Sequence, residues 1–304
     1  MLDVRRLRLL RELKIRGTLA GVAEALAYSP SAVSQQLALL EKEAGVELLQ
    51  RVGRRVKLTP QGEILVEHTG YLLERLEAAE ADLTATRTTV SGTVRVAVFQ
   101  SAAHAVIPPA LTILGEEFPG LRVEVTEREP EAGLFAVSAR DFDLVLAEQY
   151  PGHTREHRTD LDRINLVTDA LRLAVPRPRD GRAVVSGLEH ATMLPWVMEP
   201  AGTASRQWAT QLCRSAGFEP DVRFESADLI AHIHLIESGN AVGILPDLVW
   251  AGQSPTVHLL ELPGLPHRTV FSAARRSSAG RPGVIAVRDA LARAVAQVAA
   301  PSPG

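Results

Sequence analysis

The chain has 304 residues, of which 46% are hydrophobic and 23% are charged, values ordinary for a globular protein of two or three domains. No apolar run reaches the roughly 18 residues that a membrane span needs, and charges interrupt the apolar residues of the N-terminus too often for a signal peptide. Because Cys213 is the only cysteine, an intramolecular disulfide is excluded. We expect an ordinary buried thiol rather than a reactive one, in a cytoplasmic protein.

The formal net charge of −3 conceals an uneven distribution. Residues 1–58 hold 11 Lys and Arg against 6 Asp and Glu, a net charge of +5. The remainder holds 22 basic and 30 acidic residues, a net charge of −8. A small basic segment before a larger acidic one is typical of a protein in which one domain meets a polyanion, although many basic patches are only solvated faces.

Three helices are predicted in the basic segment, at about residues 2–15, 19–27 and 29–45. Thr18 and Ser29 have side chains that suit N-caps, and Pro30 suits the first position of the third helix. Gly17 and Gly45 can end the first and third helices in the left-handed conformation. The apolar stripe of the first helix is formed by Leu7, Leu10 and Leu13. A tight turn between the second and third helices indicates a helix-turn-helix.

The third helix has a polar but nearly uncharged outer face. At about 100° per residue, the side that must face the core consists of Val33, Leu37, Leu40 and Ala44. The opposite side consists of Ser31, Gln35, Ala38 and Lys42, with Ser34 on its flank. Gln36 is rotated toward the core, so we expect it to pack on a neighbouring helix or touch a phosphate. Short polar side chains can approach base edges and phosphates, whereas a solvated face is usually rich in charges. We therefore predict DNA contacts from Pro30, Ser31, Ser34, Gln35 and Lys42.

A short hairpin is predicted next, with "VGRRVKL" as two extended pieces around Gly53, Arg54 and Arg55. Four cations, at Arg51, Arg54, Arg55 and Lys57, fall within seven residues. A wing beside a recognition helix can place arginines in the minor groove or on phosphates, so Arg51, Arg54 and Arg55 are predicted to contact DNA. The alternative is a solubilising turn, which does not explain the clustering of the cations.

The stretch "AEALAYSPSAVSQQLALLEKEAGVELLQRVGRRVKLTPQGE" resembles the N-terminal winged helix-turn-helix of LysR-type transcriptional regulators. The resemblance covers about 60 contiguous residues in order and spacing. It includes Ala-Glu-Ala-Leu, Pro-Ser-Ala-Val-Ser, Leu-Glu-x-Glu-x-Gly and Leu-Thr-Pro-x-Gly. The chain departs from the family at Leu49, where Phe is more frequent. This is a core substitution that leaves the implied function intact.

A long helix is predicted from Thr59 and Pro60 to about Thr89, and its roughly 31 residues would span about 46 Å. Its apolar positions alternate at spacings of four and three, as in a coiled-coil seam: Leu65, Thr69, Leu72, Leu76, Ala79 and Leu83. We expect it to pair two subunits, as linker helices do in LysR-type proteins, rather than pack on its own domain. A dimer, or a dimer of dimers, would bring two recognition helices to two half-sites of promoter DNA.

From Gly92 onward, short strands alternate with helices, which predicts an α/β body with mostly parallel strands. The expected strands are 93–100, 121–127, 142–148, 170–176, 194–200, 221–226, 241–246, 256–262 and 269–275. The expected helices include 104–120, 203–217, 229–239 and one that runs to about 299.

The order of these elements resembles the LysR-type effector domain, which is similar to type 2 periplasmic binding proteins. The resemblance implies a multidomain chain of α+β and α/β parts. These are a winged helix-turn-helix, a linker helix, and a two-lobed α/β effector-binding domain with a ligand cleft between the lobes. The implied ranges are 1–58, 59–89 and 90–304, with the first lobe at 90–165 and 266–304 and the second at 166–265.

In open α/β sheets, ligands bind beyond the carboxyl ends of strands and at helix N-termini. This rule predicts effector contacts from Gln100, Ser101, Ala102, Glu127, Glu148, Glu199, Thr203 and Ser226. Ser101, Thr203 and Ser226 each also suit a plain N-cap. Hydroxyls and a helix N-terminus suit a carboxylate, whereas the glutamates suit an amine. The effector is therefore expected to resemble an amino acid, and no other cofactor is expected.

Signatures of catalysis are missing from the sequence, which has no Gly-x-Ser-x-Gly, P-loop or zincin motif. His153 and His157 lie four apart near two aspartates but in a polar loop, so no metal site is expected. The sequence predicts a DNA-binding regulator controlled by a small molecule, without a membrane partner. The alternatives are a solute-binding or enzymatic α/β protein with an incidental helical head, and an architectural DNA-binding protein without a ligand.

Overall fold

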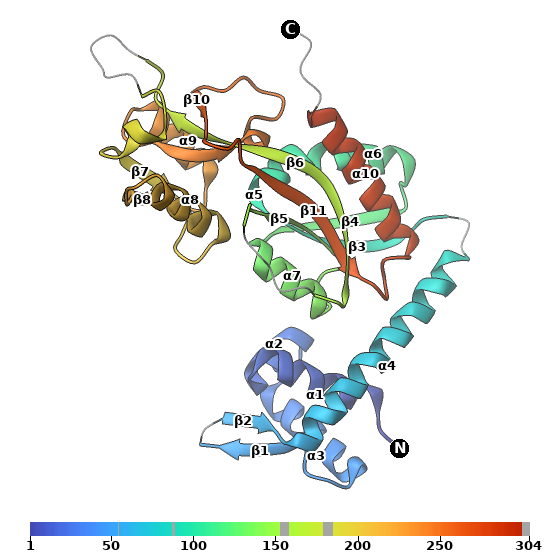
Figure 1. The fold of residues 1–304 in the computed structure, drawn as a ribbon. Helices are drawn as coiled ribbons and strands as arrows, with labels where there is room; N and C mark the ends of the chain where they lie inside the picture. Colours follow the sequence, from blue (N-terminus) through green and yellow to red (C-terminus); the bar gives the residue numbers. More distant parts are fainter. Residues whose placement is uncertain (54, 87–88, 153–157, 179–184, 300–304) are drawn as a thin grey trace. The chain divides into compact units, whose positions relative to one another are not determined.

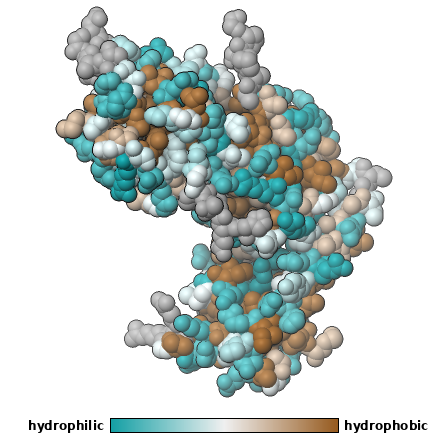
Figure 2. Space-filling view, in the orientation of Figure 1, coloured by the Kyte–Doolittle hydropathy of each residue, from teal (hydrophilic) through white to brown (hydrophobic). Residues whose placement is uncertain are grey.

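The computed structural model describes residues 1–53, 55–86, 89–152, 158–178 and 185–299 (Figure 1). The chain divides into two compact units, which we call the N-terminal unit (Met1–Thr86) and the C-terminal unit (Arg87–Gly304). Among the described residues, no helix is both long enough and apolar enough to cross a membrane. On the face that Figure 2 shows, hydrophobic and hydrophilic residues are interspersed in both units, as is ordinary for globular proteins.

The N-terminal unit consists of three short helices, a hairpin and a long helix. Their bounds are α1 Val4–Arg16, α2 Leu19–Leu26, α3 Pro30–Ala44, β1 Leu49–Val52, β2 Arg55–Leu58 and α4 Pro60–Ala85. The predicted caps are confirmed. Thr18 Oγ1 accepts a hydrogen bond from the backbone N–H of Gly21 at 3.0 Å, and Ser29 Oγ accepts one from Ala32 at 3.2 Å. Gly45 ends α3 with a φ of 70°, in the left-handed region.

The core of the N-terminal unit lies where α1, α2 and α3 meet. The predicted stripes of α1 and α3 are confirmed, since the following side chains are at most 3% exposed: Leu7, Leu10, Leu13, Val33, Leu37 and Leu40. The start of α4 packs closely against the segment before β1. A Cβ on Gly62 would lie 2.3 Å from the carbonyl oxygen of Leu48, so only glycine allows this approach.

The long helix α4 ends at Ala85, earlier than the predicted Thr89. Its 26 residues span about 39 Å at 1.5 Å per residue. The hydroxyls of Thr84 and Thr86 donate to backbone carbonyls of the last turns, which competes with continuation of the helix. Of the predicted seam, Leu65 is partly buried against the core of this unit and Thr69 is buried, whereas the remaining members are exposed within this unit, namely Leu72, Leu76, Ala79 and Leu83.

The C-terminal unit is built on a seven-stranded sheet in the order β10-β6-β11-β5-β3-β4, with β9 also paired to β6. The strands of this sheet are β3 Gly92–Val98, β4 Leu121–Glu127, β5 Leu144–Gln149, β6 Leu161–Val175, β9 Gly243–Pro246, β10 His258–Glu261 and β11 His267–Arg275. A separate two-stranded sheet is formed by β7 Pro195–Met198 and β8 Asp221–Glu225.

The expectation of mostly parallel strands is wrong. β3 pairs in parallel with β4 and β5, and β7 with β8, but β11–β5, β11–β6, β10–β6 and β9–β6 are antiparallel. The cause is the long strand β6, which crosses from the first lobe, around β3 to β5, to the second lobe, around β7 to β10 (Figure 1). Because the chain returns along β11, the two crossing strands necessarily run in opposite directions.

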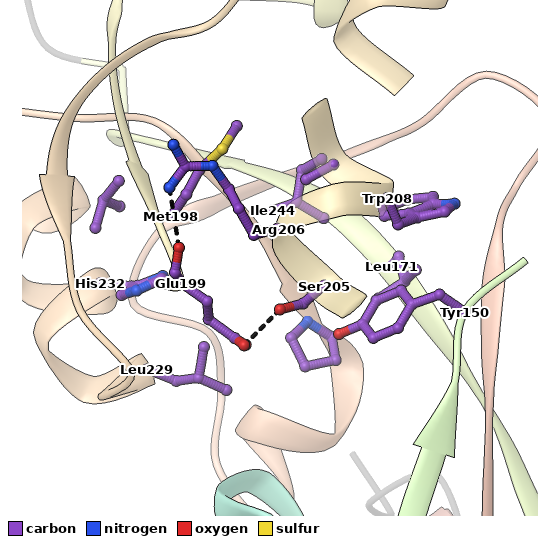
Figure 3. Close-up of a pocket in the computed structure, with 13 residues that line it drawn as sticks. Tyr150, Leu171, Met198, Glu199, Ser205, Arg206, Trp208, Leu229, His232 and Ile244 are labelled. Carbon is purple, nitrogen blue, oxygen red and sulfur yellow. Dashed lines mark hydrogen bonds between the residues drawn. The ribbon is translucent and has the colours of Figure 1, made fainter. Parts of the chain in front are cut away.

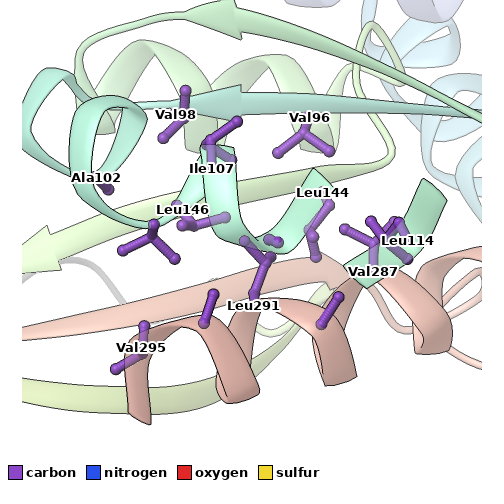
Figure 4. Packing of buried hydrophobic residues seen from close by; sticks show 14 of the residues in the cluster. Val96, Val98, Ala102, Ile107, Leu114, Leu144, Leu146, Val287, Leu291 and Val295 are labelled. Atoms are coloured by element: carbon purple, nitrogen blue, oxygen red, sulfur yellow. The ribbon is translucent and has the colours of Figure 1, made fainter. Parts of the chain in front are cut away.

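Helices cover both faces of the first-lobe sheet. α6 (Ile107–Glu117) and α10 (Pro282–Ala299) pack on one face, where Leu114 and Leu291 meet Val96 and Leu146 (Figure 4). α7 (Pro130–Ser138) packs on the other face. The predicted helix 104–120 is divided at Val106, because two prolines in the first turn of α6 favour a new helix start. The remaining elements are α5 Gln100–Ala105, η1 Leu188–Ala191, α8 Ala204–Ser215, α9 Leu229–Glu237 and η2 Asp247–Trp250.

Candidate functional site

The outer face of α3 is the exposed surface that the sequence predicts to contact DNA. All five predicted residues of this helix are exposed: Pro30, Ser31, Ser34, Gln35 and Lys42. Ser31 Oγ lies 3.0 Å from Ser29 Oγ, so this hydroxyl pair stands at the start of the helix. Gln36 is partly buried and its Oε1 accepts a hydrogen bond from Arg6 Nε at 3.0 Å. Its predicted rotation toward a neighbouring helix is therefore confirmed.

The predicted hairpin is confirmed as an antiparallel pair of β1 and β2, in which Val52 lies opposite Arg55 next to the turn. Arg51 and Lys57 are exposed. Arg54 lies outside the described residues, and Arg55 is described as the first residue of β2. The hairpin and the α3 face thus belong to one unit that presents neutral polar groups and cations to solvent.

A buried arginine, which the sequence patterns did not indicate, joins several predicted residues of the C-terminal unit. Arg268 on β11 is 2% exposed and donates from Nη2 to Ser101 Oγ at 2.8 Å and from Nε to Asp169 Oδ2 at 2.8 Å. It also bonds to the carboxylate of Glu148. Asp169 in turn accepts from the backbone N–H of Leu248 at 2.9 Å. Ser101 and Glu148, both predicted to touch the effector, are thus already engaged by Arg268.

This cluster holds one cation against two carboxylates. Burial lowers the pKa of Arg268, but the carboxylates of Glu148 and Asp169 outweigh burial and hold that pKa above its ordinary value. Burial raises the pKa of Asp169, although Arg268 opposes the shift. Because a buried charge is costly unless paired, Arg268 is required to keep both carboxylates ionised in the interior.

A cavity of about 30 Å³ lies beside this cluster, mainly in the second lobe (Figure 3). Its walls are formed by Tyr150, Leu171, Val197, Met198, Glu199, Ser205, Arg206, Trp208, Ala209, Leu229, His232, Ile244 and Pro246. Ser205 Oγ donates to the Glu199 carboxylate, and Arg206 Nη1 donates to the Glu199 backbone carbonyl at 3.0 Å. Burial, followed by repulsion from Glu148, raises the pKa of Glu199 to about 7.

His232 lines the same cavity and is 2% exposed. Its Nε2 lies 2.8 Å from the backbone carbonyl of Ser226, which can only accept, so Nε2 carries the proton. In the described part of the chain, Nδ1 has no hydrogen-bond partner. Burial lowers the pKa of His232, which favours the neutral ring. Nδ1 is therefore a buried acceptor without a donor.

Glu199 is the one member of the predicted effector set that lines this cavity. Gln100 instead connects the lobes: its Nε2 donates to Asp228 Oδ1 at 3.0 Å and its Oε1 accepts from the backbone N–H of Leu229 at 2.8 Å. Ala102 is buried in the first-lobe core, and Glu127 is exposed at the end of β4. These residues remain predicted contacts, and none of them forms part of the cavity wall.

The two remaining hydroxyls support helix starts. Thr203 is the N-cap of α8, where its Oγ1 accepts from the backbone N–H of Arg206 at 3.3 Å. Ser226 was expected to open the following helix, but Asp228 is the N-cap of α9 and Ser226 precedes it in the turn. Ser226 Oγ accepts from the backbone N–H of Asp228 at 3.1 Å. The carboxylate of Asp228, which caps α9 by accepting from the backbone N–H of Ile230 at 2.9 Å, also accepts from Gln100 Nε2.

Metal ligands do not gather in the described segments, where no group of three or more His, Cys, Asp and Glu side chains could hold an ion. His153 and His157 lie outside the described residues. His234 is exposed and pairs with Glu237, whereas His232 is buried, so these two histidines of α9 lie on different sides of the helix. Cys213 is buried, as predicted.

Comparison with known proteins agrees with this division of the chain. Residues 87–296 match the family described as LysR substrate binding domain, and residues 4–63 match the bacterial regulatory helix-turn-helix protein, lysR family. The transcriptional dual regulator GltC of Bacillus subtilis (strain 168) is 28% identical over 256 residues, 84% of each chain. A probable hydrogen peroxide-inducible genes activator of Mycobacterium avium is 29% identical over 75% of this chain and 72% of that protein.

Solved structures show the same fold. A full-length OxyR variant from Pseudomonas aeruginosa has a TM-score of 0.69 and 20% identity, over 98% of this chain and 96% of that one. Full-length CbnR in complex with its target DNA has a TM-score of 0.53 and 21% identity, over 96% of this chain and all of that one. At such identities the likeness concerns the fold and not the ligand.

Proposed function

The chain belongs to the LysR family of DNA-binding transcriptional regulators, which act through an effector-binding domain rather than as enzymes. On this basis we propose which of its surfaces contact DNA and which cavity binds the effector. The outer face of α3 and the hairpin contact promoter DNA. The cavity beside Glu199 receives the small-molecule effector. The observation that carries the DNA assignment is the alternation on α3, where Val33 and Leu37 are buried while Ser34 and Gln35 are exposed.

On α3, short hydroxyl and amide side chains allow the helix backbone to come close to a major groove. Ser31, Ser34 and Gln35 contact base edges or phosphates, and Lys42 and Arg51 contact phosphates. Arg54 and Arg55, which the resemblance places in the wing, complete the interface. Gln36 is held by Arg6 and acts within the protein. The two glutamines are therefore neighbours in sequence with different roles.

Footprinting on the promoter of the regulator's own gene tests this interface. Gln35→Ala should lose preference for the operator while keeping weak nonspecific binding, and Gln36→Ala is the matched control with the same side chain removed one position away. Replacing both Arg54 and Arg55 by Ala should weaken binding to all DNA and reduce the salt dependence by about one unit of slope per lost phosphate contact. Parent-like footprints from both would contradict the assignment.

Effector binding is proposed to act through the contacts that join the lobes. Gln100 of the first lobe touches the N-terminal end of α9, which lines the cavity through Leu229 and His232. A ligand that shifts α9 changes this bridge and hence the angle between the lobes, which couples the cavity to DNA binding. A thermal-shift screen of a metabolite library, followed by footprinting with each hit, tests the coupling; a hit that never alters the footprint argues against it.

Self-association through α4 is also proposed. The exposed Leu72, Leu76 and Leu83 fall on the predicted coiled-coil seam, and a second copy of the helix would cover them. We expect a dimer and a dimer of dimers, located in the cytoplasm where promoter DNA lies.

Some relatives of this chain are named as hydrogen peroxide-inducible genes activators, but we do not propose that this chain senses peroxide through a thiol. Cys213 is the single cysteine, and burial raises its pKa to about 12.

A further inference from the structure

We infer that the cavity beside Glu199 selects effectors that carry a protonated amine on an apolar body, with Glu199 as the specificity-determining residue. The inference rests on the proposed function, because it names the chemistry of the ligand for that same cavity. Three independent features point to a cation: the hydrogen-bonding groups on the wall, the aromatic pair, and the engagement of nearby arginines by protein groups.

The cavity wall carries an acceptor with unused hydrogen-bonding capacity, the Glu199 carboxylate. The Glu199 carboxylate accepts one hydrogen bond, from the Ser205 hydroxyl, and a carboxylate has about four lone-pair sites. His232 contributes its ring to the wall, and its Nδ1, which is unprotonated and without a partner in the described part of the chain, is buried beneath the surface of the wall. A buried acceptor that stays unpaired is costly, so a ligand that donates hydrogen bonds gains where a ligand that only accepts does not. A protonated amine donates up to three.

The rest of the wall suits the body of such a ligand. Tyr150 and Trp208 form a tilted pair with ring centroids 5.6 Å apart, and Leu171, Met198 and Ile244 complete an apolar surface (Figure 3). Aromatic faces attract ammonium groups and also pack on hydrocarbon. The cavity, with a volume of about 30 Å³, accommodates a small head group, and the aromatic pair on its wall offers an apolar surface for the body.

The described arginines at and beside this wall are already paired with protein carboxylates, Arg268 with Glu148 and Asp169, and Arg206 with Glu225. Arg268 is engaged by Glu148, Asp169 and Ser101. Arg206 lines the cavity, but its Nη1 donates to the Glu199 carbonyl at 3.0 Å and to Glu225 at 3.4 Å. A carboxylate would also lie beside Glu199, and Glu148 is close enough to raise the pKa of Glu199. The excess of negative groups therefore disfavours an anion.

Proton exchange gives this inference a signature of its own. The pKa of Glu199 is raised from 4.5 to about 7, so the ligand-free carboxyl is largely protonated at about pH 6. An ammonium group favours the ionised carboxylate, so amine binding at that pH should release a proton. The charged and titratable groups that face Glu199 are Glu148 on β5, Tyr150 directly after β5, Glu129 before α7, Arg268 on β11, Arg206 on α8 and His232 on α9. A carboxylate ligand would have the opposite effect and take up a proton.

Calorimetry on the full chain tests the inference with matched probes, butylamine and butyrate, together with phenethylamine and 3-phenylpropionate. Each is titrated at about pH 6 in two buffers of different ionisation enthalpy, so that the difference in heat reports the protons exchanged. We expect the amines to bind with release of up to about one proton and the carboxylates to bind at least about tenfold more weakly.

Glu199→Gln keeps an acceptor for Ser205 but removes the charge. It should weaken amine binding about tenfold or more and abolish the proton release, whereas Glu189→Gln, at an exposed site on η1, should change neither.

Tighter binding of the carboxylates, proton uptake with the amines, or no binding of either amine at millimolar concentration would each overturn the inference. The buffer comparison on the parent protein decides the matter even if Glu199→Gln does not fold. Footprinting without any ligand separates this outcome from a failure of the proposed function, because operator binding by α3 does not depend on which effector the cavity prefers.

Discussion

Replacing Arg268 by Gln should destabilise the C-terminal unit strongly, because it removes the cation between two buried carboxylates. Asp169 is 6% exposed and Glu148 is also 6% exposed, so neither can be hydrated in place. Breaking a buried ion pair by deleting one partner costs about 3–5 kcal/mol. For a unit of roughly 200 residues, in which about 1 kcal/mol shifts Tm by about 2–4 °C, we expect a fall of about 10 °C.

The sign of the pH dependence makes this prediction specific. In the parent, burial already holds the folded-state pKa of Asp169 above its ordinary value, and Arg268 opposes that shift. Without Arg268 nothing opposes burial, so the folded-state pKa of Asp169 must rise further above its unfolded value. A raised carboxyl pKa means that stability is highest below the unfolded pKa and is lost as pH rises through the folded one. The Gln variant should therefore be closest to the parent in Tm at about pH 5 and furthest from it at about pH 8.

Differential scanning calorimetry at a series of pH values measures both effects. The control is Arg223→Gln, which removes an exposed arginine paired with Asp221 at 2.7 Å and should change the unfolding free energy by less than about 1 kcal/mol. Adding Glu148→Gln and Asp169→Asn to the Arg268 variant should recover part of the loss. If the variant with Arg268→Gln alone is as stable as the parent at pH 8, the two carboxylates do not depend on Arg268, and the prediction is wrong.

Other predictions concern separate parts of the molecule. Leu37→Ala, at a side chain 1% exposed, should cost about 2–5 kcal/mol of unfolding free energy in the N-terminal unit and reduce operator binding in gel-shift assays. Gly62→Ala should also destabilise that unit in thermal melts, since its Cβ would meet the Leu48 carbonyl oxygen at 2.3 Å. In the ligand-free protein, Tm should fall as pH rises through about 7, where Glu199 ionises, and the fall should be smaller in Glu199→Gln. Cys213→Ala should leave any response to peroxide in the footprint unchanged, because the thiol is buried and protonated.

The N-terminal unit was predictable because its signals are local. Ser29, Pro30 and Gly45 define the ends of α3 within the helix itself, and the 100° spacing places Leu37 inside and Gln35 outside without reference to the rest of the fold. The same wheel correctly separated Gln36 from Gln35. Periodicity can do this because every determinant lies within about four residues along the chain.

The C-terminal unit was less predictable because its determinants are far apart in sequence. Strand direction in the sheet depends on β6 and β11, whose paired residues are about 100 positions apart, and no local pattern encodes that direction. Arg268 meets Glu148 120 residues away, so its role could not be seen from its own surroundings. The effector prediction reached Glu199 by the rule for strand ends. The rule did not predict His232, which lines the cavity from α9. The tautomer of His232 is fixed by the backbone carbonyl of Ser226.

The two crossing strands limit how the lobes can move. Since β6 pairs with β11 in the first lobe and with β9 and β10 in the second, both lobes share one continuous hydrogen-bonded ladder. A rotation of one lobe must therefore twist or bend that ladder, unlike domains joined by loose linkers that rotate with little resistance. The register is irregular where Val270 and Phe271 of β11 pair with Val167 and Asn165, so Leu166 of β6 is an extra residue that locally increases the twist of the ladder. Lobe movement should accordingly be elastic and of small amplitude, returning to the same geometry whenever the ligand leaves.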